Sequence, residues 1–373
     1  MNVQKPILVK DLELFKKENS IDRVIDEYEG QLKELFLIRN PQYRFNPKYQ
    51  EPLLAFIQEH KEEKLLENAG AWFYFPWGRV LVHYLPDAWH QELRTARNKN
   101  IITVDEQKKY YKAAIGIAGL SVGSHAAFTI SMMGGAKIMK IADPDVISGS
   151  NLNRIRYDFT SLGVKKCQIV LEKLYQMNPY GAVYVYDEGI TEKNIDEFLS
   201  GLDVLVEEMD NLEMKIRLRL EAKKRRIPVV MATDNGDGIL FDIERYDLDP
   251  TLKIFNGVVG DLTIDEFKKI SPSEMPRLST KIAGQYLVHP RMQTSLLEVG
   301  KTLYAWPQLG SAATLSGVAV AYVVKRILLG EKLKTGKLEV NLDALFDPDY
   351  YTTESVQKRS KDIEHFLKTI GLT

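Results

Sequence analysis

Cysteine is almost absent from this 373-residue chain, whose only thiol is Cys167. One thiol excludes an intrachain disulfide framework and any cysteine-rich zinc site, and it fits a reducing compartment. Net charge is also nearly absent, because 50 basic residues balance 51 acidic ones to leave a formal charge of -1. A chain so balanced has no overall field that would attract nucleic acid or an anionic membrane.

Long hydrophobic runs are missing as well. The most apolar stretch, residues 312–324, is interrupted by Ser316 and Gly317 and is shorter than a membrane span requires. Near the N-terminus, Lys10, Asp11 and Glu13 bring charge before an apolar signal segment can form. We therefore expect a cytoplasmic protein with no membrane partner.

The length argues for about two domains, and the character of the sequence changes along the chain. Residues 12–37 and 51–67 carry Glu, Lys and Leu at helical spacing, and an aromatic run over 72–78 followed by Val80–Val82 predicts a hairpin packed as core. We predict an N-terminal α+β accessory domain, a main domain with an insert, and a helical tail. Their ranges are 1–92, 93–345 (insert about 251–306) and 346–373.

From Tyr110 onward short apolar segments alternate with helical patterns. This alternation predicts an α/β fold with a Rossmann-like, mainly parallel sheet and helices on both faces. The expected strands are 114–118, 137–142, 183–186, 204–207 and 228–232, and the helices between them are 125–133, 166–176 and 212–225. Further strands at 238–246 and 338–341, a helix at 312–329 and an irregular segment at 249–306 complete the prediction.

A turn of small residues follows the first of these strands directly and leads into a helix. Gly119, Ser121, Gly123 and Ser124 occupy it, so backbone N–H groups and the helix N-terminus can approach phosphate oxygens. Asp143 ends the next strand, where a carboxylate commonly binds a ribose hydroxyl. Taken alone, these features favour an NAD-dependent oxidoreductase, and a merely tight turn is the plainer alternative.

The residues after Asp143 change that interpretation. Asp145, Asn151, Arg154 and Lys166 would gather at the carboxyl edge of the sheet, the usual ligand crevice of open α/β folds. Such donors and cations suit a site that polarises phosphate rather than one that shelters a nicotinamide.

This order of motifs resembles the ThiF/MoeB/HesA family, the adenylating fold shared with ubiquitin-activating enzymes. The family shows a glycine loop, then D-x-D-x-V-x-x-S-N-L-N-R-Q, then G-x-x-K, N-P and D-N. The corresponding segments here are Asp143–Val146, Ser150–Arg154, Gly163 with Lys166, Asn178-Pro179 and Asp210-Asn211. Arg94–Arg97 upstream and Gly310–Gly317 downstream extend the resemblance over about residues 92–345.

The resemblance implies ATP-dependent adenylation of a carboxylate, which yields an acyl-adenylate and pyrophosphate. It gives Arg154 and Lys166 phosphate-binding roles, Arg97 a contact with pyrophosphate that often comes from a partner subunit, and Asp210 the magnesium-associated acid. The remaining predicted nucleotide-binding residues are Gly119, Ser121, Gly123, Ser124, Asp143, Asp145 and Asn151. It also implies ATP and Mg²⁺ as cofactors and a homodimer. The substrates it suggests are carboxylates of carrier proteins or peptides, or of a modified tRNA nucleoside.

Two departures from the family limit the chemistry. The only cysteine, Cys167, is expected to be a buried helix residue rather than a thioester-forming nucleophile, and the C-x-x-C pairs that hold zinc in several relatives are absent, so no zinc is expected. The Asp234–Gly238 cluster could shape an acceptor pocket or simply be a turn, and Asp210 could cap a helix. An NAD-dependent oxidoreductase and a non-catalytic nucleotide-binding module stay as alternatives.

Overall fold

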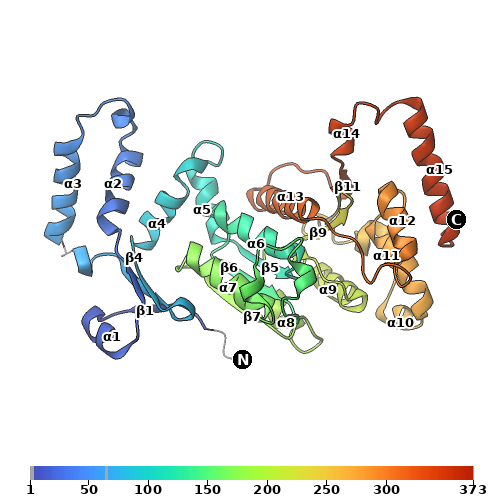
Figure 1. The fold of residues 1–373 in the computed structure, drawn as a ribbon, viewed down its shortest axis with the longest axis horizontal. Helices are drawn as coiled ribbons and strands as arrows, with labels where there is room; N and C mark the ends of the chain where they lie inside the picture. Colours follow the sequence, from blue (N-terminus) through green and yellow to red (C-terminus); the bar gives the residue numbers. More distant parts are fainter. Residues whose placement is uncertain (1–3, 64–65, 373) are drawn as a thin grey trace. The chain divides into compact units, whose positions relative to one another are not determined.

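The computed structural model describes residues 4–63 and 66–372, and the chain divides into two compact units. The first unit comprises the described residues up to Tyr111 together with Ser131–Gly135 and Leu171–Gly181. The second unit comprises Lys112–Ile130, Ala136–Val170 and the residues from Ala182 onward. Figure 1 traces both along the chain, the first in blue and cyan at its start and the second ending in red.

The first unit contains a four-stranded sheet in the order β1-β3-β4-β2. Its strands are β1 (Ile7–Val9), β2 (Arg23–Ile25), β3 (Ala71–Phe75) and β4 (Val80–Tyr84). The antiparallel β3–β4 pair confirms the predicted hairpin. Trp72, Tyr74 and Leu81 are buried together, so the aromatic run forms core as expected.

The helices of the first unit are shorter than the sequence pattern suggested. They are α1 (Leu12–Glu18), α2 (Tyr28–Arg39), α3 (Gln50–Glu63), α4 (Asp87–Arg94) and α5 (Val104–Lys112). The helical spacing over 12–37 is interrupted, because Arg23–Ile25 pairs with Val80–Val82 as strand β2. Two β-branched residues in that segment favour the strand, which overrides the helical spacing around it.

The second unit is built on a seven-stranded sheet in the order β11-β10-β9-β8-β5-β6-β7. Its strands are β5 (Ala114–Ala118), β6 (Ile138–Ala142), β7 (Ala182–Tyr186), β8 (Val204–Glu207), β9 (Val229–Asn235), β10 (Gly238–Glu244) and β11 (Gly336–Val340). The five strands from β9 to β7 are parallel, and β10 and β11 pair antiparallel at one edge. The chain runs outward from β5 to β7 and then returns to β8 on the other side of β5. Ligands bind at such a switch point, where the carboxyl ends of β5 and β8 meet.

Helices cover both faces of this sheet, as predicted. They include α6 (Val122–Met132), α8 (Ile195–Leu199), α9 (Leu212–Lys224) and α13 (Gly310–Leu329), with α7 (Lys166–Met177) after β6. A Cβ on Gly116 of β5 would meet Leu202 and Phe198 beside α8, whereas Ile117 on the opposite face lies against Gly123 of α6. Gly317 of α13 lies directly against His125 of α6, so these two helices share a face.

Helix α13 is longer than the apolar run that the sequence analysis considered. Its 20 residues are long and apolar enough to cross a membrane by length and composition, which for a single helix is weak evidence. Half of its most apolar window is buried, and residues including Ala312, Ser316 and Val324 are inaccessible against the neighbouring strands β8, β9 and β10. In this structure α13 is therefore a core helix.

The segment 249–306 was predicted to be irregular, and this prediction is wrong because the segment contains short helices. These are α10 (Ile264–Phe267), α11 (Met275–Ala283) and α12 (Pro290–Glu298), followed near the C-terminus by α14 (Asp343–Phe346) and α15 (Thr353–Thr369). α12 and α15 lie side by side (Figure 1), with Val288, Phe366 and Leu367 buried between them. Thr263 and Glu266 form a capping box that starts α10, a local signal that the apolar pattern did not reveal.

Candidate active site

The glycine turn after β5 has the tight geometry that its sequence predicts. Gly119 has a φ of +93°, and a Cβ on it would lie 2.3 Å from the backbone oxygen of Glu208. Gly123, in the first turn of α6, packs closely against the Ile117 side chain of β5. A Cβ on Gly123 would lie 2.9 Å from that side chain. Only glycine fits the first position, since an L-residue would be both strained and in collision with the end of β8.

The two serines of the turn have different surroundings. The Ser124 hydroxyl donates to the backbone oxygen of Ser121 at 2.8 Å and is fully buried. The Ser121 hydroxyl is also buried but has no hydrogen-bond partner among the described residues. A buried hydroxyl is normally hydrogen-bonded, so Ser121 is suited to contact a bound ligand.

Three of the predicted residues meet at the carboxyl end of β6. The Lys166 ammonium lies 2.8 Å from Asp145 and 3.5 Å from Asp143. Asp143 accepts the Leu120 N–H at 2.7 Å and the Asp145 N–H at 2.9 Å, and thereby fastens the glycine turn to β6. Burial raises the pKa of the Asp143 carboxyl, and the nearby Lys166 cation opposes that shift. Asp145 is the exposed carboxylate of the pair.

The segment 149–154 forms the next wall of the site. Asn151 is buried and its side-chain oxygen accepts the Ser148 N–H at 3.1 Å, which closes a short 3-10 turn. Arg154 donates to the Ser150 backbone oxygen at 2.9 Å and to Asn153 at 3.0 Å. The backbone oxygen of Arg154 accepts a hydrogen bond of 2.6 Å from His125, which attaches this segment to α6.

Asp210 lies in the turn between β8 and α9. Asn211, not Asp210, caps α9, because its side chain accepts the Met214 N–H at 3.0 Å. The capping alternative for Asp210 is therefore wrong. Its carboxylate is exposed and forms no hydrogen bond or ion pair with the residues that the structure describes. Gly119 contacts the adjacent Glu208 and Met209 backbone, so the glycine turn and the Asp210 turn are neighbours.

Buried polar atoms without partners gather around the glycine turn. Eight such side-chain atoms occur among the described residues, and four belong to this part of the fold: Ser121 Oγ, His125 Nδ1, Arg154 Nε and Tyr157 Oη. Because native proteins leave few buried polar groups unpaired, these atoms are available to form hydrogen bonds with a polar ligand. Neither His125 nor Tyr157 was expected at the site from the sequence. The signal for His125 was its position one residue after Ser124 on the helix.

Asp234, near the end of β9, is another residue whose role the sequence left open. It is buried, accepts hydrogen bonds from Ser316 at 3.1 Å and Gln308 at 3.3 Å, and burial raises its pKa to about 6. The hairpin between β9 and β10 turns at Gly236, with a φ of +66°. The Asp234–Gly238 cluster is thus partly a turn and partly a buried acid. The positive charge of Arg154 opposes the rise in the Asp234 pKa.

The sequence also pointed to Arg97 and Cys167. Arg97 belongs to the first unit, where it is exposed in the short helix Ala96–Asn98, and its role at pyrophosphate stays a prediction. Cys167 is buried at the start of α7, with its thiol 3.4 Å from the Asp143 backbone oxygen. This position confirms the expected buried helix cysteine, and burial raises the pKa of its thiol to about 12.

No group of three or more His, Cys, Asp or Glu side chains that could hold a metal ion occurs within residues 4–63 and 66–372. A magnesium ion bound mainly by phosphates and water needs only one or two protein carboxylates, so Asp210 alone is a sufficient donor set for that ion.

The fold and this arrangement define an open, doubly wound α/β protein with a glycine turn at the switch point of its sheet. Residues 94–340 match the ThiF family, and the chain belongs to it. The family assignment confirms the resemblance drawn from the order of motifs.

Three relatives illustrate the similarity. An uncharacterized protein of Mycobacterium tuberculosis is 34% identical over 310 residues, covering 83% of this chain and 43% of that protein. The tRNA threonylcarbamoyladenosine dehydratase of Escherichia coli is 29% identical over 45% of this chain and 63% of its own length. A probable molybdopterin-synthase adenylyltransferase of Gracilaria tenuistipitata is 29% identical over 30% of this chain and 32% of its own length. This chain thus spans less than two thirds of the length of each of these relatives.

Proposed function

We propose that this protein uses ATP to adenylate a carboxylate, releasing pyrophosphate, and passes the acyl group to an external or substrate-borne nucleophile. The observation that carries the proposal is the concentration of unpartnered buried polar atoms around the glycine turn, at the switch point of a ThiF-family fold. The relatives named as adenylyltransferase and tRNA dehydratase support the same reaction class.

The residues at the glycine turn suit a bound nucleoside triphosphate. Gly119 has no side chain to keep a phosphate away from the backbone. Ser121 offers that phosphate a buried hydroxyl with no partner among the described residues, and the N-terminus of α6 turns its positive dipole end toward it. Arg154 has a buried Nε–H with no partner, which can donate to a phosphate oxygen. We infer that Asp143 and Asp145 face the ribose side and that Asn151 lies near the phosphates.

In the proposed reaction a carboxylate oxygen of the substrate attacks the α-phosphorus. The new P–O bond forms as the bond to pyrophosphate breaks, and pyrophosphate leaves with the electron pair. Lys166 and Arg154 stabilise the negative charge on the α-phosphoryl oxygens, the type of preorganised donor that usually contributes most to such a step. Asp210 would hold Mg²⁺, which when bound neutralises phosphate charge.

The substrate, assembly and location of the protein complete the proposal. We propose a cytoplasmic homodimer in which Arg97 of one protomer reaches pyrophosphate at its partner's site. The carboxylate would belong to a carrier protein, a peptide or a modified tRNA nucleoside, and the accessory domain, residues 1–92, would recognise it. Domain boundaries at about 92 and 345 remain a prediction, as does the absence of zinc.

Exchange of labelled pyrophosphate into ATP tests this function. We expect exchange that depends on Mg²⁺ and on one member of a panel of carboxylates comprising peptide C-termini, carrier-protein C-termini and tRNA bearing threonylcarbamoyladenosine. No exchange with any member, combined with saturable NAD binding, would instead favour an oxidoreductase. ATP binding without exchange, unaffected by Lys166→Ala, would favour a non-catalytic binding module.

A further inference from the structure

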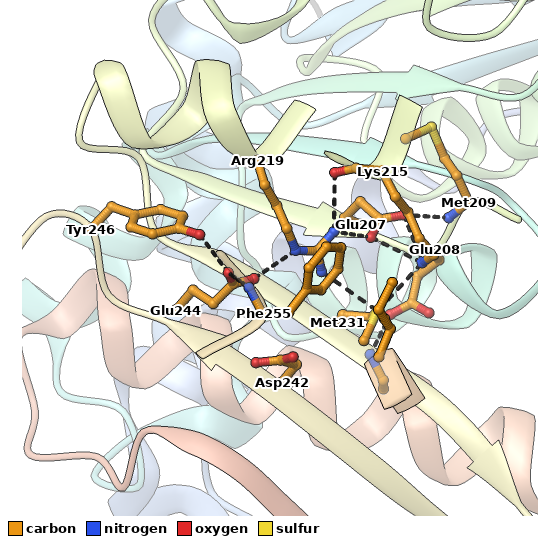
Figure 2. A network of polar contacts seen from close by, with 12 residues as sticks. Glu207, Glu208, Met209, Lys215, Arg219, Met231, Asp242, Glu244, Tyr246 and Phe255 are labelled. Carbon is orange, nitrogen blue, oxygen red and sulfur yellow. Dashed lines mark hydrogen bonds and ion pairs between the residues drawn. The ribbon is translucent and has the colours of Figure 1, made fainter. Parts of the chain in front are cut away.

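A cluster of charged side chains is buried next to the turn that carries Asp210. Figure 2 shows Glu207 at the end of β8, Arg219 on α9 and Glu244 at the end of β10, all three of whose side chains are inaccessible to solvent. The Arg219 guanidinium joins the two carboxylates, donating to Glu244 at 2.7 Å and to Glu207. Lys215, one helical turn earlier, donates to both oxygens of Glu207 at 3.0 Å.

Stability alone does not account for this cluster. Replacing a buried ion-pair network with apolar residues of similar volume is often neutral or stabilising, because desolvation offsets the attraction between the charges. The strand β8 is otherwise apolar (Val204, Leu205 and Val206), and an apolar residue in place of Glu207 would continue that pattern. The geometry around Glu207 therefore needs a further reason.

The reason lies in the backbone of the next turn. One oxygen of Glu207 accepts the Met209 N–H at 2.7 Å (Figure 2). The Glu208 N–H donates to Ala118 at 2.7 Å, and the Glu208 carboxylate accepts the Ala232 N–H at 2.9 Å. Residues 207–209 are thus fixed to β5 and β9, and Asp210 follows them directly with a carboxylate that has no partner in the described chain.

The same cluster also reaches the segment after β10. Glu244 accepts the Phe255 N–H at 2.6 Å and the Tyr246 hydroxyl, and the Arg219 guanidinium stacks over the Phe255 ring at 4.1 Å. Phe255 has a φ of +51°, a conformation that a bulky residue rarely adopts unless its surroundings impose it. Arg219 therefore connects the start of the 249–306 segment to Glu207.

We propose that Glu207, held by Lys215 and Arg219, is a positioning residue that fixes the turn so that Asp210 presents its carboxylate to the metal of the bound nucleotide. This inference rests on the proposed function and assigns a role to residues that the family motifs do not include. Glu207 uses both of its oxygens, one toward Met209 and one toward Arg219. Glutamine has a single acceptor oxygen, so Glu207→Gln cannot satisfy the backbone and both cations together.

Metal affinity tests the proposal without need of the unknown substrate. The protein is saturated with α,β-methylene-ATP, Mn²⁺ is added in place of Mg²⁺, and free Mn²⁺ is followed by its electron paramagnetic resonance signal. Asp210→Asn should weaken Mn²⁺ binding to a low but measurable affinity, and Glu207→Gln should weaken it about 10–100-fold, the range typical when a residue that orients a metal ligand is changed. The affinity for the nucleotide without metal should stay near that of the unaltered protein.

Glu213→Gln is the matched control. It makes the same chemical change on the following helix, α9, where Glu213 pairs with Arg217, and Mn²⁺ binding should be unchanged. In an Asp210→Asn background, Glu207→Gln should cause no further loss, because a residue that acts through Asp210 has nothing left to position. If Glu207→Gln does not fold, Lys215→Met replaces it, with a loss in the same direction expected.

The outcomes separate the two proposals. Additive losses in the double variant, or unchanged Mn²⁺ affinity in a folded Glu207→Gln or Lys215→Met protein, would overturn the positioning role. Failure of the unaltered protein to bind the ATP analogue would overturn the proposed function itself. Unchanged Mn²⁺ affinity in Asp210→Asn would overturn the assignment of Asp210, and with it the positioning of that residue by Glu207.

Discussion

Lys166 and Asp145 form an ion pair of 2.8 Å at the carboxyl end of β6, and both residues were selected from the sequence as nucleotide-binding. In this pair, a carboxylate balances the charge of a buried ammonium group. Lys166 is almost completely buried, and Asp145 together with Asp143 compensates its charge before any ligand arrives. In the proposed function, phosphate oxygens would replace part of that compensation at an ammonium group that is already held in place.

Lys166→Ala should lower the rate of pyrophosphate exchange by about 10²–10³-fold, the loss typical of one preorganised charge-stabilising donor. Lys165→Ala is the matched control, because the neighbouring Lys165 donates to the backbone oxygens of Pro144 and Asp187 instead. Circular dichroism would check that both variants fold. An equal loss in the two variants would contradict a specific role for Lys166.

Gly119→Ala should prevent ATP binding and lower the free energy of unfolding by at least about 1–3 kcal/mol, the usual range for a residue forced into a positive φ. The added methyl group would also meet the Glu208 backbone oxygen at 2.3 Å and displace the Asp210 turn. Gly201→Ala is the control, since Gly201 also has a positive φ (+70°) but open space around it, so this variant should lose stability and keep ATP binding. Isothermal calorimetry and urea unfolding measure the two effects. Retention of ATP binding in a folded Gly119→Ala protein would contradict the assignment of the turn.

Asp234 should make stability depend on pH in a defined direction. Its pKa of about 6 in the folded chain exceeds the ordinary value of 3.8, so between these pH values the folded protein holds a proton that the unfolded chain has released. The free energy of unfolding therefore falls by up to about 3 kcal/mol as pH rises from about 4 to about 6. Asp234→Asn removes that penalty and should be relatively more stable at pH 7.5 than at pH 4. If the difference in free energy of unfolding between Asp234→Asn and the unaltered protein does not change with pH, Asp234 is not the source of the pH dependence.

Cys167 should be unreactive and dispensable. Its buried thiol, with a pKa raised to about 12, has almost no thiolate at neutral pH, and the thiolate is the nucleophile. Ellman's reagent should label it only after unfolding, and Cys167→Ala should keep pyrophosphate exchange. Rapid labelling of the folded protein, or loss of exchange in a stable Cys167→Ala variant, would reopen a thioester mechanism.

Much of the second unit could be predicted because its physical signals are local. Strands such as Ala114–Ala118 are buried on both faces, so they appear as short, continuous apolar runs, and they lie where the sequence predicts them. The turn at Gly119 also depends on residues next to one another in the chain. Family membership follows from the order of several such signals, none of which is specific alone.

What escaped prediction depends on partners far apart in sequence. Glu207 and Arg219 look like ordinary surface charges until β10 supplies Glu244 and closes the network (Figure 2). One signal was available, because Arg219 lies three residues after Ile216 and three before Ala222, on the buried face of α9. Strand β2 was missed because three residues carry too little pattern to outweigh the helical spacing on either side.

Calorimetric titration of the protein with ATP and with NAD decides which nucleotide the switch-point site binds. If the site binds ATP as proposed, the titrations will show saturable, Mg²⁺-enhanced ATP binding that NAD does not displace and that Lys166→Ala weakens. Saturable NAD binding that ATP fails to displace would contradict it.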